Sequence, residues 1–167
     1  MELGLTIPLE RFLRHSAPPY GHESDHRFCW DLHCIDLRGR KSLLSVHCHS
    51  RYTFVLFDLT STEWSDLPNT FLNSLRQSLT AIGIKKADID HYLLRAGNCT
   101  LTKTHGRREV AFLNRAWEDA LQLEYAVDPG TKGQPFLDYG INAKPCRCAG
   151  FEGIGTALER INHSLSL

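Results

Sequence analysis

The segment "WDLHCIDLRGRKSLLSVHCHSRYTFVLFDL" (residues 30–59) decides the fold, because runs rich in β-branched and aromatic residues follow one another in it. The turn "RGRK" (residues 38–41) separates the first run from the second, so we expect two or three strands of an antiparallel meander. Successive side chains of a strand point to opposite faces of a sheet, so a pairing of Leu37 with Ser42 would predict which side chains share a face. One face would carry His33, Ile35, Leu37, Leu44, Val46 and Cys48, and the opposite face Cys34, His47 and His49.

Helical periodicity follows the meander. Pro68 suits a first helical turn and Gly83 a C-cap, and between them one apolar face is formed by Phe71, Leu72, Leu75, Leu79 and Ile82. Further helices are predicted over residues 5–15, over residues 86–95, from about Arg108 and at the end, where the apolar positions are Ile154, Leu158, Ile161 and Leu165. The run "CTLTKTH" (residues 99–105) predicts a returning strand.

These elements predict a single α+β domain over residues 1–167. Its antiparallel sheet of about four strands, from a meander near residues 30–60 and a strand near 99–105, would pack against four or five helices. A chain of 167 residues is the size of one domain and can bury roughly two thirds of its unfolded surface.

The overall charge and hydropathy argue against whole classes of partner. Nineteen basic residues balance nineteen acidic ones, so a general nucleic-acid or membrane binder is not indicated. No apolar run approaches the roughly 20 residues that cross a bilayer, and no small-residue cleavage site follows the start. We therefore expect a cytoplasmic protein without a membrane partner, in which the six cysteines are mostly reduced.

The stretch "LTKTHGRREVAFLNRAW" (residues 101–117) is the first candidate site. A strand here turns at Gly106 into a helix with apolar positions Val110, Leu113, Trp117 and Leu121. Arg107 and Asn114 are seven residues apart and would project from nearly the same side of that helix. Arg107 or Arg108 beside a free helix N-terminus could bind phosphate or carboxylate.

An internal role for the same residues is the competing interpretation. Asn114 would then be buried and bond the backbone of a neighbouring strand or of the segment "GINAKP" (residues 140–145). Because the helix macrodipole repels nearby cations, an acidic partner for the arginines is expected in either case.

The chain also resembles an uncharacterised bacterial domain of unknown function that ends in a pattern close to K-T-x-x-R-S-V-L-G-S-M-N. The resemblance runs from about residue 30 to about residue 120, and the residues that match in identity or character are Lys103, Thr104, Arg107, Val110 and Asn114. The departures are Arg108, Glu109, Ala111, Phe112 and Leu113. The resemblance implies no activity, but it implies a setting among plasmid-borne and other mobile elements, and it adds Lys103 and Thr104 to the binding candidates.

Cysteine and histidine form the second candidate site. Cys34, His47 and His49 on one sheet face, with a fourth ligand from Cys146 or Cys148, could hold a structural zinc ion. Simple burial of reduced thiols is the alternative, in which case no cofactor is needed.

Evidence for an enzyme is weak. A catalytic cysteine needs a histidine within hydrogen-bond reach, and Cys48 beside His47 and His49, or Cys99 with His105, could provide one. The common hydrolase, nucleotide-binding and metalloprotease motifs are absent from the sequence. We therefore favour a macromolecule-binding domain, with another protein as the expected partner and an accessory or regulatory role.

Two alternatives stay open. Basic residues could form a nucleic-acid-binding patch despite the neutral total, and they are Arg38, Arg40, Lys41, Lys85, Lys86, Lys103, Arg107, Arg108 and Arg115. The other alternative is a small enzyme or anion-binding protein with its site at Arg107 and Asn114.

Overall fold

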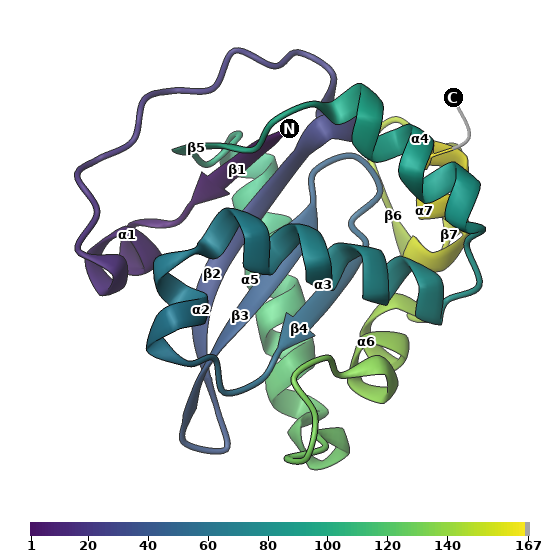
Figure 1. The fold of residues 1–167 in the computed structure, drawn as a ribbon. Coiled ribbons are helices and arrows are strands. Elements are labelled where there is room, and N and C mark those ends of the chain that lie inside the picture. Colours follow the sequence, from purple (N-terminus) through teal and green to yellow (C-terminus); the bar gives the residue numbers. More distant parts are fainter. Residues whose placement is uncertain (166–167) are drawn as a thin grey trace.

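The computed structural model describes residues 1–165 and contains a central sheet (Figure 1). Its five strands lie in the order β4-β3-β2-β1-β5. The strands are β1 (Glu2–Leu5), β2 (Cys29–Leu37), β3 (Arg40–His47), β4 (Thr53–Leu56) and β5 (Thr100–Lys103). A separate two-stranded sheet pairs β6 (Cys146–Arg147) with β7 (Ile154–Gly155). The α+β class and the meander are thus confirmed.

The prediction of a purely antiparallel sheet was wrong. Strand β1 lies between β2 and β5 and is parallel to both, with Glu2 paired to Cys29 on one side and to Thr100 on the other. The strand "ELGL" went unnoticed because four residues carry almost no periodic signal, and Glu2 and Gly4 interrupt its apolar character. Strand direction depends on long-range pairing, which local periodicity does not encode.

The β2–β3 hairpin has a tighter turn than the sequence suggested. Leu37 pairs with Arg40 rather than with Ser42, and the two turn residues Arg38 and Gly39 have φ of 48° and 75°. Positive φ at both central positions is the geometry of a type I′ turn, which matches the twist of the strands. Because the register differs by two residues rather than one, the predicted residues within β2 and β3 stay on their predicted faces, whereas Cys48 and His49 lie beyond β3 in a turn.

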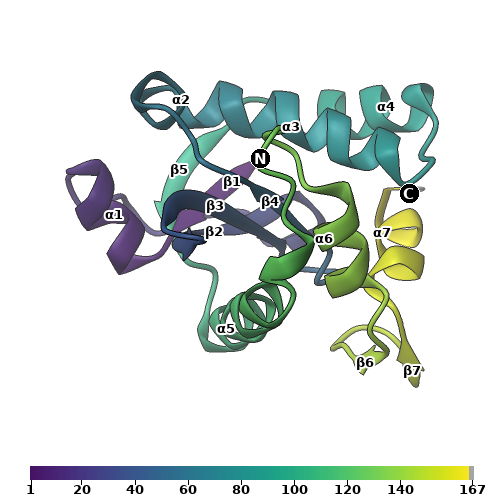
Figure 2. The same ribbon diagram turned by 90° about the horizontal axis from the view of Figure 1, so that it is seen from below.

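Helices cover both faces of the sheet (Figure 2). Those of the described residues are α1 (Ile7–Leu13), α2 (Ser61–Ser65), α3 (Leu67–Ala81), α4 (Lys86–Ala96), α5 (Arg107–Gln122), α6 (Pro135–Asn142) and α7 (Ala157–Leu165), with 3₁₀ turns η1 (His26–Phe28) and η2 (Glu124–Ala126). The short helices α2 and α6 were not predicted, and Ile154 lies in β7 rather than in the closing helix. Helices α3 and α4 cover one sheet face and α5 the other.

Each face has its own core. Trp30 is fully buried in the first core, against Phe54 and Phe71. The second core lies under α5 and includes Ile35, Leu44 and Leu113. The sheet therefore separates two apolar layers, as expected for a domain built from packed layers.

Helix α5 presents a different face to the sheet than predicted. Leu113 is buried as expected, but the other buried positions are Glu109, Ala116 and Ala120, whereas Trp117 and Leu121 are 36% and 42% exposed. The prediction was wrong because apolar spacing alone does not mark Glu109 as an inward position. Its carboxylate instead lies under the start of the helix, 2.5 Å from Arg108 Nη2 and 3.3 Å from His26 Nδ1.

Side chains of α6 cap the outer edge of the sheet. The Asn142 side chain accepts a hydrogen bond from the Thr53 N–H at 2.8 Å and donates one to the Thr53 carbonyl, and Asp138 Oδ1 accepts one from the Val55 N–H at 2.9 Å. Backbone groups of an edge strand normally need water or another strand. Here buried side chains satisfy both groups of Thr53 and the N–H of Val55, and Leu56 forms a backbone bridge with Gly133, so this edge of β4 is covered.

We predict that Asn142→Ala lowers the free energy of unfolding by about 3 kcal/mol, because it leaves two buried backbone groups of Thr53 unpaired. Urea titration of both variants measures the loss. Asn69→Ala, at an exposed position of α3, removes hydrogen bonds to Asp66 and serves as the control, with an expected loss below about 0.5 kcal/mol. Equal losses for the two variants would contradict this assignment.

Candidate functional site

The residues predicted for an anion site lie on the surface at the start of α5. Arg107, Arg108 and Asn114 are exposed, while Lys103 and Thr104 are half-buried at the end of β5. The acidic partner expected there is Glu109, which binds Arg108 at 2.5 Å. Because Asn114 is exposed, the competing interpretation that it bonds a neighbouring backbone internally was wrong.

An asparagine of the "GINAKP" segment performs that internal role instead. Asn142 of this segment, rather than Asn114, bonds the neighbouring strand. The segment is therefore a structural wall beside β4.

The predicted zinc ligands are not brought together. Both ring nitrogens of His47 are engaged, by the Ser50 hydroxyl at 2.7 Å and by the Arg27 carbonyl at 2.9 Å. Burial lowers the pKa of His47 to about 3. His49 Nδ1 lies 2.8 Å from the Ser164 hydroxyl.

The cysteines of that set are also separately engaged. Cys148 Sγ donates to the His49 carbonyl at 3.3 Å, and Cys146 Sγ accepts from Arg160. Burial raises the pKa of Cys34 to about 11. Among residues 1–165, groups of three possible metal ligands do occur with their ligand atoms within 4.8 Å of one another. None of these groups includes any of the five predicted zinc ligands.

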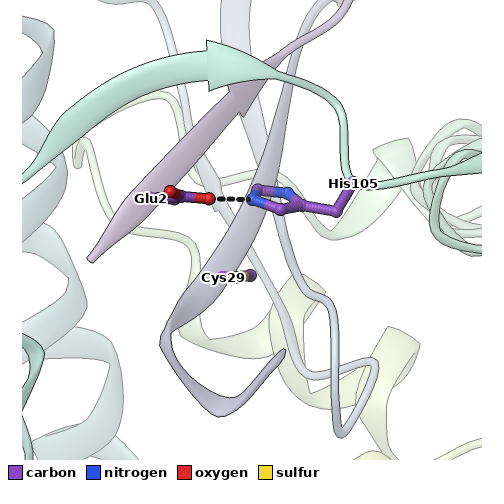
Figure 3. Close-up of side chains that lie close together, drawn as sticks. All are labelled: Glu2, Cys29 and His105. Atoms are coloured by element: carbon purple, nitrogen blue, oxygen red, sulfur yellow. Dashed lines mark hydrogen bonds and ion pairs between the residues drawn. The ribbon is translucent and has the colours of Figure 1, made fainter. Parts of the chain in front are cut away.

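A different cluster of ionisable side chains lies under the sheet around His105. His105 follows β5, and its ring lies across β1 and β2 (Figure 3). Its Nδ1 donates to Asp31 Oδ1 at 2.7 Å, and its Nε2 lies 3.2 Å from Glu2 Oε2. The backbone N–H of His105 also donates to Asp31 at 3.2 Å. One imidazole is thus held between two carboxylates.

Glycine at position 4 creates the space for this contact. A Cβ built on Gly4 would lie 2.2 Å from Asp31 Oδ1 and 3.0 Å from His105 Nδ1. Asp31 pairs with Gly4 across the parallel strands, so its carboxylate and the imidazole occupy the position where a side chain would stand. The interruption of "ELGL" by glycine is therefore a requirement of the cluster.

The segment between α1 and η1 covers the Glu2 side of the cluster. Glu2 Oε1 accepts hydrogen bonds from the N–H groups of His22 at 2.7 Å and Glu23 at 3.1 Å. Gly21 lies so close that an added Cβ would stand 2.0 Å from Glu2 Oε2. Only a fraction of the Glu2 side chain is therefore accessible.

Two buried thiols flank the imidazole. Cys48 Sγ lies 3.6 Å from His105 Nδ1. Cys29 Sγ, a carboxylate oxygen of Glu2 and a ring nitrogen of His105 all lie within 4.8 Å of one another. Burial raises the pKa of both thiols. A nucleophilic cysteine needs a lowered pKa and access to substrate, so the cluster does not resemble a cysteine-hydrolase site.

The charges of the cluster depend on one another. Burial alone would lower the pKa of His105, but its hydrogen bonds to Asp31 and to both thiols raise it. Burial acts to raise the pKa of Glu2, and the N–H groups of His22 and Glu23 lower it overall. Burial raises the pKa of Asp31 despite its hydrogen bond to His105. The raised pKa of His105 and the lowered pKa of Glu2 favour a charged imidazolium beside the Glu2 carboxylate.

Sequence reasoning missed this site. It considered Cys48 with its sequence neighbours and His105 with Cys99, whereas the structure places Cys48 beside His105. The cluster joins residues from position 2 to position 105, and no local motif links them. The glycine within a strand was the one available signal of a close approach.

The predicted basic patch is interrupted by acidic partners. Lys41 binds Asp36 at 2.8 Å, and Lys86 binds Asp90. Arg38 instead donates to the Val127 carbonyl at 3.2 Å. Local neutralisation weakens the case for a phosphate-binding surface.

A second concave site opens at the edge of the sheet. A cleft of about 820 Å³ lies between α3, β4, α6 and α7, and we call it the α3–α6 cleft. Its walls are mostly apolar and include Phe54, Leu56, Ile82, Tyr139 and Leu158. Polar side chains also line the cleft, and they include Gln77, Ser78, Lys132, Gln134, Asp138 and Asn162.

The fold and the two sites describe a mixed α+β domain with a buried ionisable cluster and an apolar cleft. A family model described as "Domain of unknown function (DUF6933)" matches residues 2–159, so the chain belongs to that family. No curated protein matches the chain. In the part of the chain that the structure describes, every helix is too short or too polar to span a bilayer.

We predict that Gly4→Ala lowers the free energy of unfolding by about 2–4 kcal/mol, because the methyl group displaces Asp31 from His105. Gly133→Ala is the matched control, since nothing lies within 4 Å of a Cβ added there. Chemical denaturation of both variants gives the comparison. If Gly4→Ala were as stable as Gly133→Ala, the proposed close approach would not exist in solution.

Proposed function

We propose that this protein is a binding domain that holds a small, largely apolar molecule in the α3–α6 cleft. The observation that carries the proposal is the cleft itself. Its volume of about 820 Å³ falls within the roughly 300–1,000 Å³ that is usual for small-molecule sites. Mostly apolar walls with a few polar groups are also typical of such sites.

The capped edge of β4 favours a small ligand over an extended peptide. A peptide that adds to a sheet needs free backbone N–H and C=O groups. In β4 the outward groups of Thr53 and the N–H of Val55 are already bonded to α6 side chains. The main contacts left to a ligand are the side chains of the cleft.

Asp138 gives the cleft a polar group of unusual character. It is buried, and that burial raises its pKa well above the usual carboxyl value, although the Val55 N–H opposes the shift. A carboxyl group that stays protonated can donate a hydrogen bond. Lys132 also lines the cleft, but it is paired with Glu63 at 3.2 Å. The cleft therefore suits a neutral ligand with a hydrogen-bond acceptor more than an anion.

We predict that N-phenyl-1-naphthylamine, a neutral apolar fluorophore, binds saturably at one site per chain. Ala81→Trp should weaken this binding at least about tenfold, because Ala81 lines the cleft and an indole would fill it. Fluorescence titration of the wild type and the variant provides both numbers.

Thr80→Trp is the matched control, since Thr80 is exposed on the same helix and is not part of the cleft lining. It should bind the fluorophore like the wild type. Absence of saturable binding, or equal binding by Ala81→Trp, would contradict the proposal.

A protein partner is the second candidate, as the sequence suggested. Tyr125 of η2 and Phe136 of α6 are 79% and 81% exposed, and η2 and α6 pack together. Exposed aromatic side chains of this kind are common in protein interfaces. An accessory role on a bacterial mobile element remains part of this second proposal.

For that candidate, we predict that the double variant Tyr125→Ser/Phe136→Ser no longer recovers a defined partner that the wild type recovers from its native cells. Leu94→Ser, at an equally exposed position on α4, should still recover it. Quantitative mass spectrometry of the captured proteins distinguishes the variants. Equal recovery by all three proteins would argue against this surface.

A further inference from the structure

The cluster around His105 supports an inference that is independent of the cleft. We propose that Glu2, Cys29 and His105 bind one zinc ion through Oε2, Sγ and Nε2. These three side chains come from β1, β2 and the segment after β5, and their ligand atoms all lie within 4.8 Å of one another. Figure 3 shows the Glu2 carboxylate directed at the imidazole, with Cys29 beside both.

Interatomic distances favour these three ligands over a second possible set, which consists of Asp31, Cys48 and His105. In tetrahedral zinc, ligands about 2.0–2.2 Å from the metal stand about 3.4 Å from one another. The 3.2 Å between His105 Nε2 and Glu2 Oε2 is close to that separation. The 2.7 Å between Nδ1 and Asp31 Oδ1 is a hydrogen bond and leaves no room for an ion between these atoms.

Asp31 occupies the position of an outer-shell carboxylate. Zinc-binding histidines usually donate their other ring N–H to a carboxylate or carbonyl, which fixes the tautomer and the ring orientation. Asp31 accepts from Nδ1 and from the backbone N–H of the same residue. Nε2 is therefore the ring nitrogen directed toward Glu2 and available to a metal.

Glu2 is oriented in a similar way. Its Oε1 accepts from the N–H groups of His22 and Glu23, which leaves Oε2 facing the imidazole. Both donors belong to the segment that covers this end of the sheet. The carboxylate is thus held in place before any metal binds, which lowers the cost of ordering a ligand.

A metal-free ion pair does not require a thiol at the position of Cys29. An imidazolium between two carboxylates accounts for Glu2 and Asp31 without any thiol. Cys29 is fully buried, and apart from its contact with the His105 ring its Sγ makes a long 3.8 Å contact with the Asp25 carbonyl. As a thiolate ligand, it would gain a strong partner in the metal.

The donor types select the metal. One thiolate, one imidazole and one carboxylate suit zinc, whereas magnesium and calcium prefer oxygen ligands alone. Binding would release to solvent the protons carried by Cys29 Sγ and His105 Nε2. Three protein ligands leave a fourth position, which a water molecule can fill.

Equilibrium dialysis of the reduced, chelator-treated protein against zinc chloride, with metal counted by mass spectrometry, tests the proposal. We expect one zinc ion per chain. Cys29→Ser and Glu2→Gln should each weaken binding at least about tenfold. Cys34→Ser, which changes a half-buried cysteine outside the cluster, should bind zinc like the wild type.

Cobalt chloride supplies a second measurement. A thiolate-to-cobalt charge-transfer band should appear in the wild type and vanish in Cys29→Ser. Circular dichroism confirms that each variant is folded, and Glu2→Gln keeps the test decisive if Cys29→Ser does not fold. Absence of stoichiometric zinc in the wild type, or loss of binding in Cys48→Ser but not in folded Cys29→Ser and Glu2→Gln, would overturn the proposal.

Discussion

The hydrogen bonds between His105 and Asp31 are the constraint on which the rest of this structure depends. They fix the turn after β5 against β2, across the glycine of β1 that makes the approach possible. The chain then passes through Gly106, whose φ of 141° favours glycine, and enters α5 with Glu109 directed inward. The buried face of α5 follows from that entry.

Opposite edges of the sheet show two ways of satisfying exposed backbone groups. At β4, amide and carboxyl side chains of α6 replace a neighbouring strand. At β5, the Lys103 N–H donates to the Pro19 carbonyl, in the same segment that holds Glu2. A candidate site lies next to each edge. The α3–α6 cleft lies beside β4, and the ionisable cluster lies near β5.

Sequence patterns predicted what local physics determines. The helices with strong apolar periodicity and the faces of the β2–β3 hairpin were correct, the latter because a register error of two residues preserves alternation. Strand β1, the inward face of α5 and the site at His105 were missed, since each depends on contacts between distant segments. A buried Glu109 and an edge-capping Asn142 break the usual rule that polar residues lie outside.

A double-mutant cycle between Asp31→Asn and His105→Gln, measured by chemical denaturation in the presence of a chelator, tests the central claim most directly. The chelator removes any contribution from bound metal. If the two side chains interact as described, their effects on the free energy of unfolding will be coupled by about 2 kcal/mol. Additivity within about 0.5 kcal/mol would contradict the account, because independent side chains could not hold β1, β2 and the start of α5 together.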